Sequence, residues 1–189
     1  MSKLRSIQMA AASPATKTKA QTKAKSPARR TRNTGRRDPL AVVLLKQDHR
    51  EVEAWFDEYE QLDNDREKLA LFNKIALALK VHTQIEEEIL YPAERGEVED
   101  DMLDEAYVEH DGAKKLIAEL EAMKPSDEFY DAKVKVLGEY IKHHVKEEEQ
   151  PGGIFAQAKK GDEDLDALGE RLKARKQELM AQHGRSAAH

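Results

Sequence analysis

The sequence contains no cysteine, and this absence limits its chemistry. Disulfides, thiolate metal ligands and thiol nucleophiles are excluded, so any metal ion must be held by nitrogen and oxygen donors. No apolar run approaches the ~18 residues expected of a membrane helix. We therefore expect a soluble, cytoplasmic protein without a transmembrane segment.

Glycine and proline are sparse after residue 40, whereas charged residues make up 37% of the chain. This composition is typical of a largely helical protein. The serines lie in expected loops or tails without a nearby histidine and aspartate, and no glycine-rich phosphate loop occurs. The sequence therefore argues against a hydrolase.

The first 37 residues contain no acidic residue and eleven Lys or Arg. All 37 acidic residues follow, against 21 Lys and Arg, so residues 38–189 have a formal charge of −16. The basic segment has almost no large apolar side chains, and we expect it to be disordered because it cannot bury a core. Three interpretations stay open: a solvated tail, a contact for nucleic acid or another polyanion, and a targeting segment. No signal peptide is visible.

From residue 38 onward, apolar residues recur at the three- and four-residue spacing of amphipathic helices. Asp38-Pro39 has the pattern of an N-cap followed by proline at the first helical position. The expected breaks are Asp63-Asn64-Asp65, Pro92 with Gly96, Lys124-Pro125-Ser126 and Pro151-Gly152-Gly153. The expected helices cover about 38–62, 66–91, 100–122 and 127–149, and a further amphipathic segment covers about 162–182.

Four helices of this length joined by short breaks favour an all-α, up-down-up-down four-helix bundle. We expect three parts: a disordered basic arm over 1–37, the bundle over 38–160, and a C-terminal helix and tail over 161–189. The C-terminal helix should lie on the outside of the bundle, and residues from His183 onward should fray.

A repeated unit is the most informative pattern in the chain: a lone histidine followed by His-x-x-x-Glu. The first copy contains His49, His82 and Glu86, and the second contains His110, His144 and Glu148. Corresponding residues are 61 or 62 positions apart. This duplication suggests a metal site built around a pseudo-twofold axis.

All six side chains continue the apolar stripes of their helices, so we expect them to point into the bundle. Residues four apart share a helical face, which puts the two members of each His-x-x-x-Glu pair on one side. A buried carboxylate without a partner costs several kcal/mol, and a shared cation would satisfy all six groups. These ligands suit a two-metal site of iron or manganese, and zinc also accepts them.

Simpler explanations exist for each part of the pattern. A single histidine on an apolar stripe is usually a hydrogen-bonded core residue, and one His-x-x-x-Glu pair is usually a solvent-exposed ion pair. The acidic runs at 86–88 and 147–149 could be solvated faces. Chance poorly explains two such pairs plus two lone histidines at matched offsets, so we favour the metal site.

His143 competes with His144 as a ligand because it also stands four residues before a glutamate. Leu137, Ile141 and His144 share a stripe, whereas His143 is displaced by about 100°. We therefore predict that His144 is the ligand. A carboxylate behind each metal-bound imidazole is expected, but the sequence does not place one, and Glu53 fits that role and a solvated position equally well.

These residues resemble the hemerythrin-like HHE cation-binding domain over about residues 38–160. The motifs that carry the resemblance lie at 44–53, 82–92, 109–110 and 143–149. The resemblance implies a four-helix bundle with a non-heme di-iron centre that meets O2 or a related small oxidant. By motif, the metal ligands would be His49, His82, Glu86, His110, His144 and Glu148, with both glutamates able to bridge.

The chain departs from the oxygen-carrying hemerythrins, which have His-x-x-x-His on the third helix, because Lys114 stands four residues after His110. One iron would then lack an imidazole and keep an open or water-filled position, which argues against reversible oxygen carriage. Our leading expectation is a di-iron protein that binds or reacts with O2, nitric oxide or peroxide in sensing or stress response. The alternatives are iron storage or buffering without catalysis, and a nucleic-acid-associated sensor that uses the basic arm.

Overall fold

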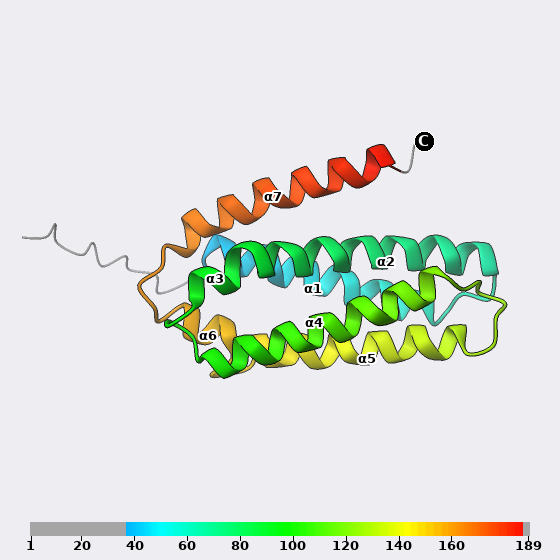
Figure 1. Ribbon diagram of the computed structural model, residues 1–189, viewed down its shortest axis with the longest axis horizontal. Coiled ribbons are helices and arrows are strands. Elements are labelled where there is room, and N and C mark those ends of the chain that lie inside the picture. The colour runs from blue at the N-terminus through cyan, green and yellow to red at the C-terminus, as the bar shows by residue number, and fades with distance from the viewer. Residues whose placement is uncertain (1–36, 187–189) are drawn as a thin grey trace, which may run out of the picture. The chain divides into compact units, whose positions relative to one another are not determined.

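The computed structural model describes residues 37–186, and in that range it contains helices but no strand (Figure 1). The elements are α1 (Leu40–Tyr59), α2 (Asp65–Ile85), the π-helical turn η1 (Glu86–Leu90), α3 (Tyr91–Glu94), α4 (Asp100–Glu121), α5 (Tyr130–Glu149), α6 (Ile154–Ala158) and α7 (Leu165–Ser186). None of the helices in this range has both the length and the apolar composition needed to cross a membrane. The disorder expected of the basic arm concerns residues outside the described range.

Helices α1, α2, α4 and α5 form the expected four-helix bundle (Figure 1). α1 packs against α2 and α5, and α4 packs against the same two helices. The turn before α2 ends at Asn64, whose side chain accepts hydrogen bonds from the N–H groups of Arg66 and Glu67 at 2.9 and 3.2 Å. The all-α prediction is confirmed, although α1 ends and α5 begins a few residues inside the expected limits.

Asp38 does not cap α1, so that prediction was wrong. The helix begins at Leu40 after Pro39, and no side chain caps it. Asp38 instead accepts hydrogen bonds from Lys46 at 2.9 Å and from Lys159 at 3.0 Å. The carboxylate therefore pairs with the two ammonium groups and not with the N–H groups at the start of α1. The Lys159 contact links this start to the end of α6.

The π-helical turn η1 was not predicted from the sequence. The N–H of Tyr91 bonds to the carbonyl of Glu86, five residues earlier, and the helix ends at Glu94. Pro92 has no N–H to donate to the carbonyl of Glu87, which accepts a hydrogen bond from the Tyr107 hydroxyl at 3.3 Å. Such turns are frequent at functional sites, and this one begins at a predicted ligand.

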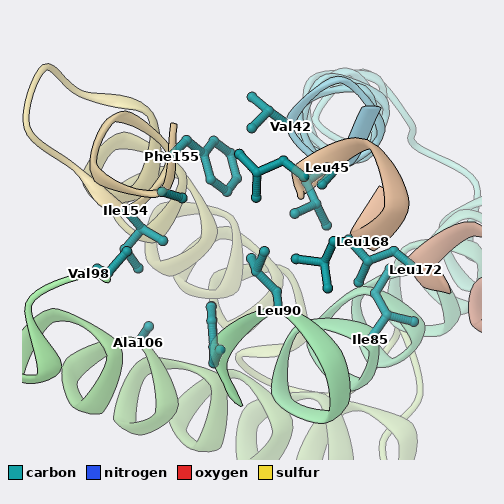
Figure 2. Packing of buried hydrophobic residues seen from close by; sticks show 14 of the residues in the cluster. Val42, Leu45, Ile85, Leu90, Val98, Ala106, Ile154, Phe155, Leu168 and Leu172 are labelled. Carbon is teal, nitrogen blue, oxygen red and sulfur yellow. The ribbon is translucent and has the colours of Figure 1, made fainter. Parts of the chain in front are cut away.

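Helix α7 packs against α1 and α2, outside the four-helix arrangement as expected. Gly169 permits the close approach, because a Cβ there would lie 2.5 Å from the backbone nitrogen of Ala41. Figure 2 shows Leu168 and Leu172 of α7 in one buried cluster with Ile85 of α2. α7 continues to Ser186, beyond its expected limit, and the short helix α6 was not predicted.

The apolar core consists of two clusters of buried side chains, and polar residues separate them. On α1, Leu45 belongs to the first cluster and Val52 to the second, with His49 between them. His110 has the equivalent position on α4. The predicted ligands therefore lie where the hydrophobic core is interrupted.

Candidate metal centre

All six predicted ligands are buried inside the bundle. Their exposed fractions are 3% for His49, 5% for His82, 0% for Glu86, 1% for His110, 4% for His144 and 0% for Glu148. His49 and His110 lie near the middle of α1 and α4, whereas His82 and His144 lie near the C-terminal ends of α2 and α5. The helices bring all six residues together between the two apolar clusters.

One group of donor atoms contains His49, His82 and both glutamates. The Nε2 atoms of His49 and His82 lie 3.1 Å apart. His49 Nε2 lies 3.3 Å from Glu148 Oε2, and His82 Nε2 lies 3.2 Å from Glu86 Oε2. Donors that share an ion at about 2.1 Å are separated by about 3.0–3.4 Å, so these distances suit a single ion.

A second group of donor atoms contains Glu86 and the other two histidines. The Nε2 atoms of His110 and His144 also lie 3.1 Å apart. His110 Nε2 lies 3.4 Å from Glu86 Oε2, and His144 Nε2 lies 3.7 Å from Glu148 Oε1. Both glutamates therefore lie between two pairs of imidazoles, which is the arrangement that a pseudo-twofold axis requires.

Each of the four imidazoles has a carboxylate behind it. The Nδ1 contacts are His49 with Glu149 at 2.7 Å, His82 with Asp48 at 3.5 Å, His110 with Glu87 at 3.0 Å, and His144 with Glu109 at 2.7 Å. An ionised carboxylate only accepts hydrogen bonds, so each Nδ1 carries a proton and donates it. The Nε2 atoms consequently face inward and are the atoms that would bind a cation.

These four carboxylates were expected but could not be placed from the sequence. They occupy equivalent positions in the two copies, because Asp48 and Glu109 precede the lone histidines and Glu87 and Glu149 follow the ligand glutamates. This repetition is the signal that could have identified them. Among the described residues, Glu53 contacts no imidazole; it pairs with Arg50, which binds Glu149 at 2.5 Å.

Lys114 and His143 lie outside the ring of donors. Lys114 Nζ lies 2.5 and 2.6 Å from the two carboxylate oxygens of Glu87, so it supports the group behind His110 and does not enter the interior. The His143 side chain is 61% exposed, whereas His144 is buried. The predicted helix phase, with His144 inward and His143 outward, agrees with this placement.

Among the residues that the structure describes, the buried glutamates of the site lack hydrogen-bond partners for several oxygens, and the pKa values of the site residues are shifted. Both carboxylate oxygens of Glu86 and Oε2 of Glu148 are buried without a hydrogen-bond partner in the described part of the chain. Burial, and then the charge of Glu148, raises the pKa of Glu86 well above its usual value. Burial lowers the pKa of His82 to about 4. Burial would also lower the pKa of His49, but Glu148 and Glu149 outweigh it and raise that pKa to about 9.

The inward Nε2 atoms and the orphaned oxygens therefore fit a bound metal cation. A positive ion between each pair of Nε2 atoms would satisfy them together with the carboxylate oxygens.

Two aromatic rings make the halves of the site inequivalent. Tyr91 stacks on His110 with ring centroids 5.5 Å apart, and its hydroxyl donates to Glu148 Oε1 at 3.1 Å. Phe155 stacks on His49 with centroids 5.8 Å apart. The half that contains His110 thus has a hydroxyl group where the other half has only a phenyl ring.

Two hollows adjoin the site. An apolar cavity of about 10 Å³ is lined by Asp48, His49, Val52, Leu79, His82, Thr83, His110, Ile141, His144 and Val145. Its volume suits about one water-sized molecule. A larger hollow of about 100 Å³ is lined mainly by α4 and α5 and includes His144 and Glu148.

Sequence comparison identifies the family of this chain. The hemerythrin HHE cation-binding domain matches residues 40–151, which is more than half of the chain. The chain belongs to the hemerythrin HHE cation-binding family. This result confirms the resemblance and makes the protein a metal-binding, hemerythrin-like protein.

Two further comparisons place this family member among known proteins. A crystal structure of a hemerythrin HHE cation-binding domain-containing protein from Mycobacterium kansasii shares the fold, with a TM-score of 0.63 and 23% identity over 74% of this chain and 86% of that chain. A DNA nickase from Nostoc sp. (strain PCC 7120 / SAG 25.82 / UTEX 2576) is 28% identical over 119 residues, which cover 63% of this chain and 34% of the nickase. This chain therefore spans about a third of that relative's length.

Proposed function

We propose that this protein holds a non-heme di-iron centre and binds or reacts with O2, nitric oxide or peroxide in sensing or stress response. One observation carries the proposal: two pairs of inward-facing Nε2 atoms share two buried carboxylates, Glu86 and Glu148. Imidazole and carboxylate ligands suit iron and manganese.

The donor set leaves room for a small ligand. The four imidazoles and two carboxylates supply fewer donor atoms than two octahedral ions require. When bound, the iron ions would supply electrons and open coordination positions. The apolar cavity of about 10 Å³ beside the imidazoles has room for about one water-sized molecule, so large substrates would not fit there.

The protein's own groups would control protons and orientation at this site. The four carboxylates behind the imidazoles hold the rings in place and fix their protons on Nδ1. The hydroxyl of Tyr91 lies 3.3 Å from His110 Nε2 and donates its proton to Glu148 Oε1, so it orients that carboxylate beside His110.

The proposal is tested on full-length protein loaded with ferrous iron under anaerobic conditions. Absorption spectra are recorded before and after addition of O2, nitric oxide or peroxide, for wild type, His110→Ala and the control His183→Ala, which alters an exposed histidine of α7. Wild type and control should change spectrum, and His110→Ala should lose iron. Protein that binds no iron, or whose spectrum ignores all three reagents, would refute the proposal. Rapid loss of iron to mild chelators without a spectral response would favour storage or buffering.

A second candidate function is association with nucleic acid. Residues 1–37 contain eleven Lys or Arg and no acid, and one relative is named a DNA nickase. Contacts to phosphate weaken steeply with salt. DNA binding should therefore fall as salt rises and disappear when residues 1–37 are deleted, and binding unchanged by that deletion would exclude this role for the arm.

A further inference from the structure

The two equivalent faces of the metal centre are covered differently. Behind His82, the carboxylate of Asp48 pairs with Lys176 of α7. Val81 and Ile85 on the same face are 1% and 0% exposed. They lie in the cluster that includes the α7 leucines, as Figure 2 shows for Ile85. Helix α7 thus closes this side of the site.

The corresponding positions on α5 carry polar, accessible side chains. His143 and Glu147 stand 62 residues after Val81 and Ile85, and their side chains are 61% and 29% exposed. His143 Nε2 lies 3.2 Å from Glu147 Oε1 and 3.5 Å from Glu109 Oε1. One imidazole nitrogen and two carboxylate oxygens are therefore gathered on the open face, close enough to share an ion.

This outer cluster is connected to the buried ligands. Glu109 contacts His143 through Oε1. Its Oε2 accepts a hydrogen bond from His144 Nδ1 at 2.7 Å. Glu109, Glu147, His144 and Glu148 line the same hollow of about 100 Å³. Glu148 is wholly buried there, and its Oε2 has no hydrogen-bond partner in the described residues. The hollow thus leads from exposed donors to an unsatisfied inner ligand.

We propose that Glu109, His143 and Glu147 form an outer binding site for a divalent transition-metal cation, through which ions enter the buried centre. The donor set of one imidazole and two carboxylates suits ferrous or manganous ions. An acidic cleft also raises the local concentration of cations and the rate at which they bind. The inference rests on the proposed di-metal function, because the inner ligands are the destination of the ion.

The test uses full-length, metal-free protein and Mn²⁺ as the probe. Equilibrium dialysis measures how many Mn²⁺ ions are bound. Stopped-flow detection of the decrease in free Mn²⁺ measures how fast they bind. His143→Ala/Glu147→Gln removes two outer donors, and His183→Ala/Glu170→Gln removes the same side-chain types from exposed positions on α7. Wild type and control should bind one weak ion in addition to the inner ions.

The outer-site variant should lose the weak ion and fill the inner site at least about tenfold more slowly, while the final inner occupancy stays unchanged. Equal loading rates in the variant and the control, or no additional weak ion in wild type, would overturn the inference and leave the di-metal proposal intact. Wild-type protein that holds no ion tightly would overturn both.

Discussion

Glu86→Gln is the substitution that best separates the metal site from ordinary core packing. Glu86 is wholly buried, and neither of its carboxylate oxygens has a hydrogen-bond partner among the described residues. Glutamine has nearly the same shape but no charge. In metal-free protein at pH 8, the substitution should therefore raise the free energy of unfolding by about 1–3 kcal/mol, because glutamine has no charge that burial and Glu148 would disfavour.

The pH dependence of this effect has a definite sign. Burial and Glu148 raise the pKa of Glu86 in the folded protein, so the folded state binds its proton more tightly than the unfolded state. Stability from this group is fully present below the unfolded pKa and is lost as pH rises through the folded pKa. The difference between variant and wild type should thus grow from pH 4 to pH 8.

Bound metal should make wild type more stable than Glu86→Gln, the reverse of the order expected for the metal-free proteins. An ion present at about 100 times its dissociation constant stabilises the folded protein by about 2.7 kcal/mol per site, and Glu86 lies in both donor groups. Urea unfolding followed by circular dichroism, with and without Mn²⁺, measures the effect, and Glu170→Gln serves as the control. The reasoning is refuted if Mn²⁺ stabilises Glu86→Gln as much as wild type, or if the metal-free variant is the less stable protein at pH 8.

Four further substitutions give distinct outcomes. Metal analysis of purified protein should show that His144→Ala loses metal, whereas His143→Ala keeps the inner ions at equilibrium. Tyr91→Phe leaves a buried carboxylate oxygen without its donor and should lower the free energy of unfolding by about 1–2 kcal/mol in urea titrations. Burial, followed by nearby carboxylates, raises the pKa of Glu94 to about 7 from 4.5, so wild type should lose stability as pH rises between these values. Glu94→Gln should match wild type at pH 4 and be more stable by roughly 2 kcal/mol at pH 8.

The helical bundle and the direction of the ligands could be predicted because both follow from periodicity. Apolar residues at three- and four-residue spacing define which face of a helix is buried, and the same spacing orients His144 inward and His143 outward. The short helix α6 has too few residues for such a pattern. Asp38 binds Lys46 and Lys159 and does not cap the N-terminus of α1. Lys159 is distant in sequence, so periodicity could not reveal this contact.

The surroundings of the ligands were harder to predict. Glu87 and Glu149 lie about 100° from the inward stripe, and their contacts with His110 and His49 depend on how neighbouring helices face each other. Tyr91 is five residues after Glu86. In a regular α-helix, a side chain at that spacing would point away from the site. The π-helical turn η1 changes the phase and brings Tyr91 to Glu148, which α-helical periodicity cannot reveal.

The metal content of freshly purified full-length protein tests the central claim most directly. Six inward-facing donors in two groups should retain about two iron or manganese ions per chain, and the ions should be lost when Glu86 and Glu148 are both changed to glutamine. Wild-type protein that retains no transition metal after purification and reconstitution, or a double variant that keeps both ions, would contradict the claim.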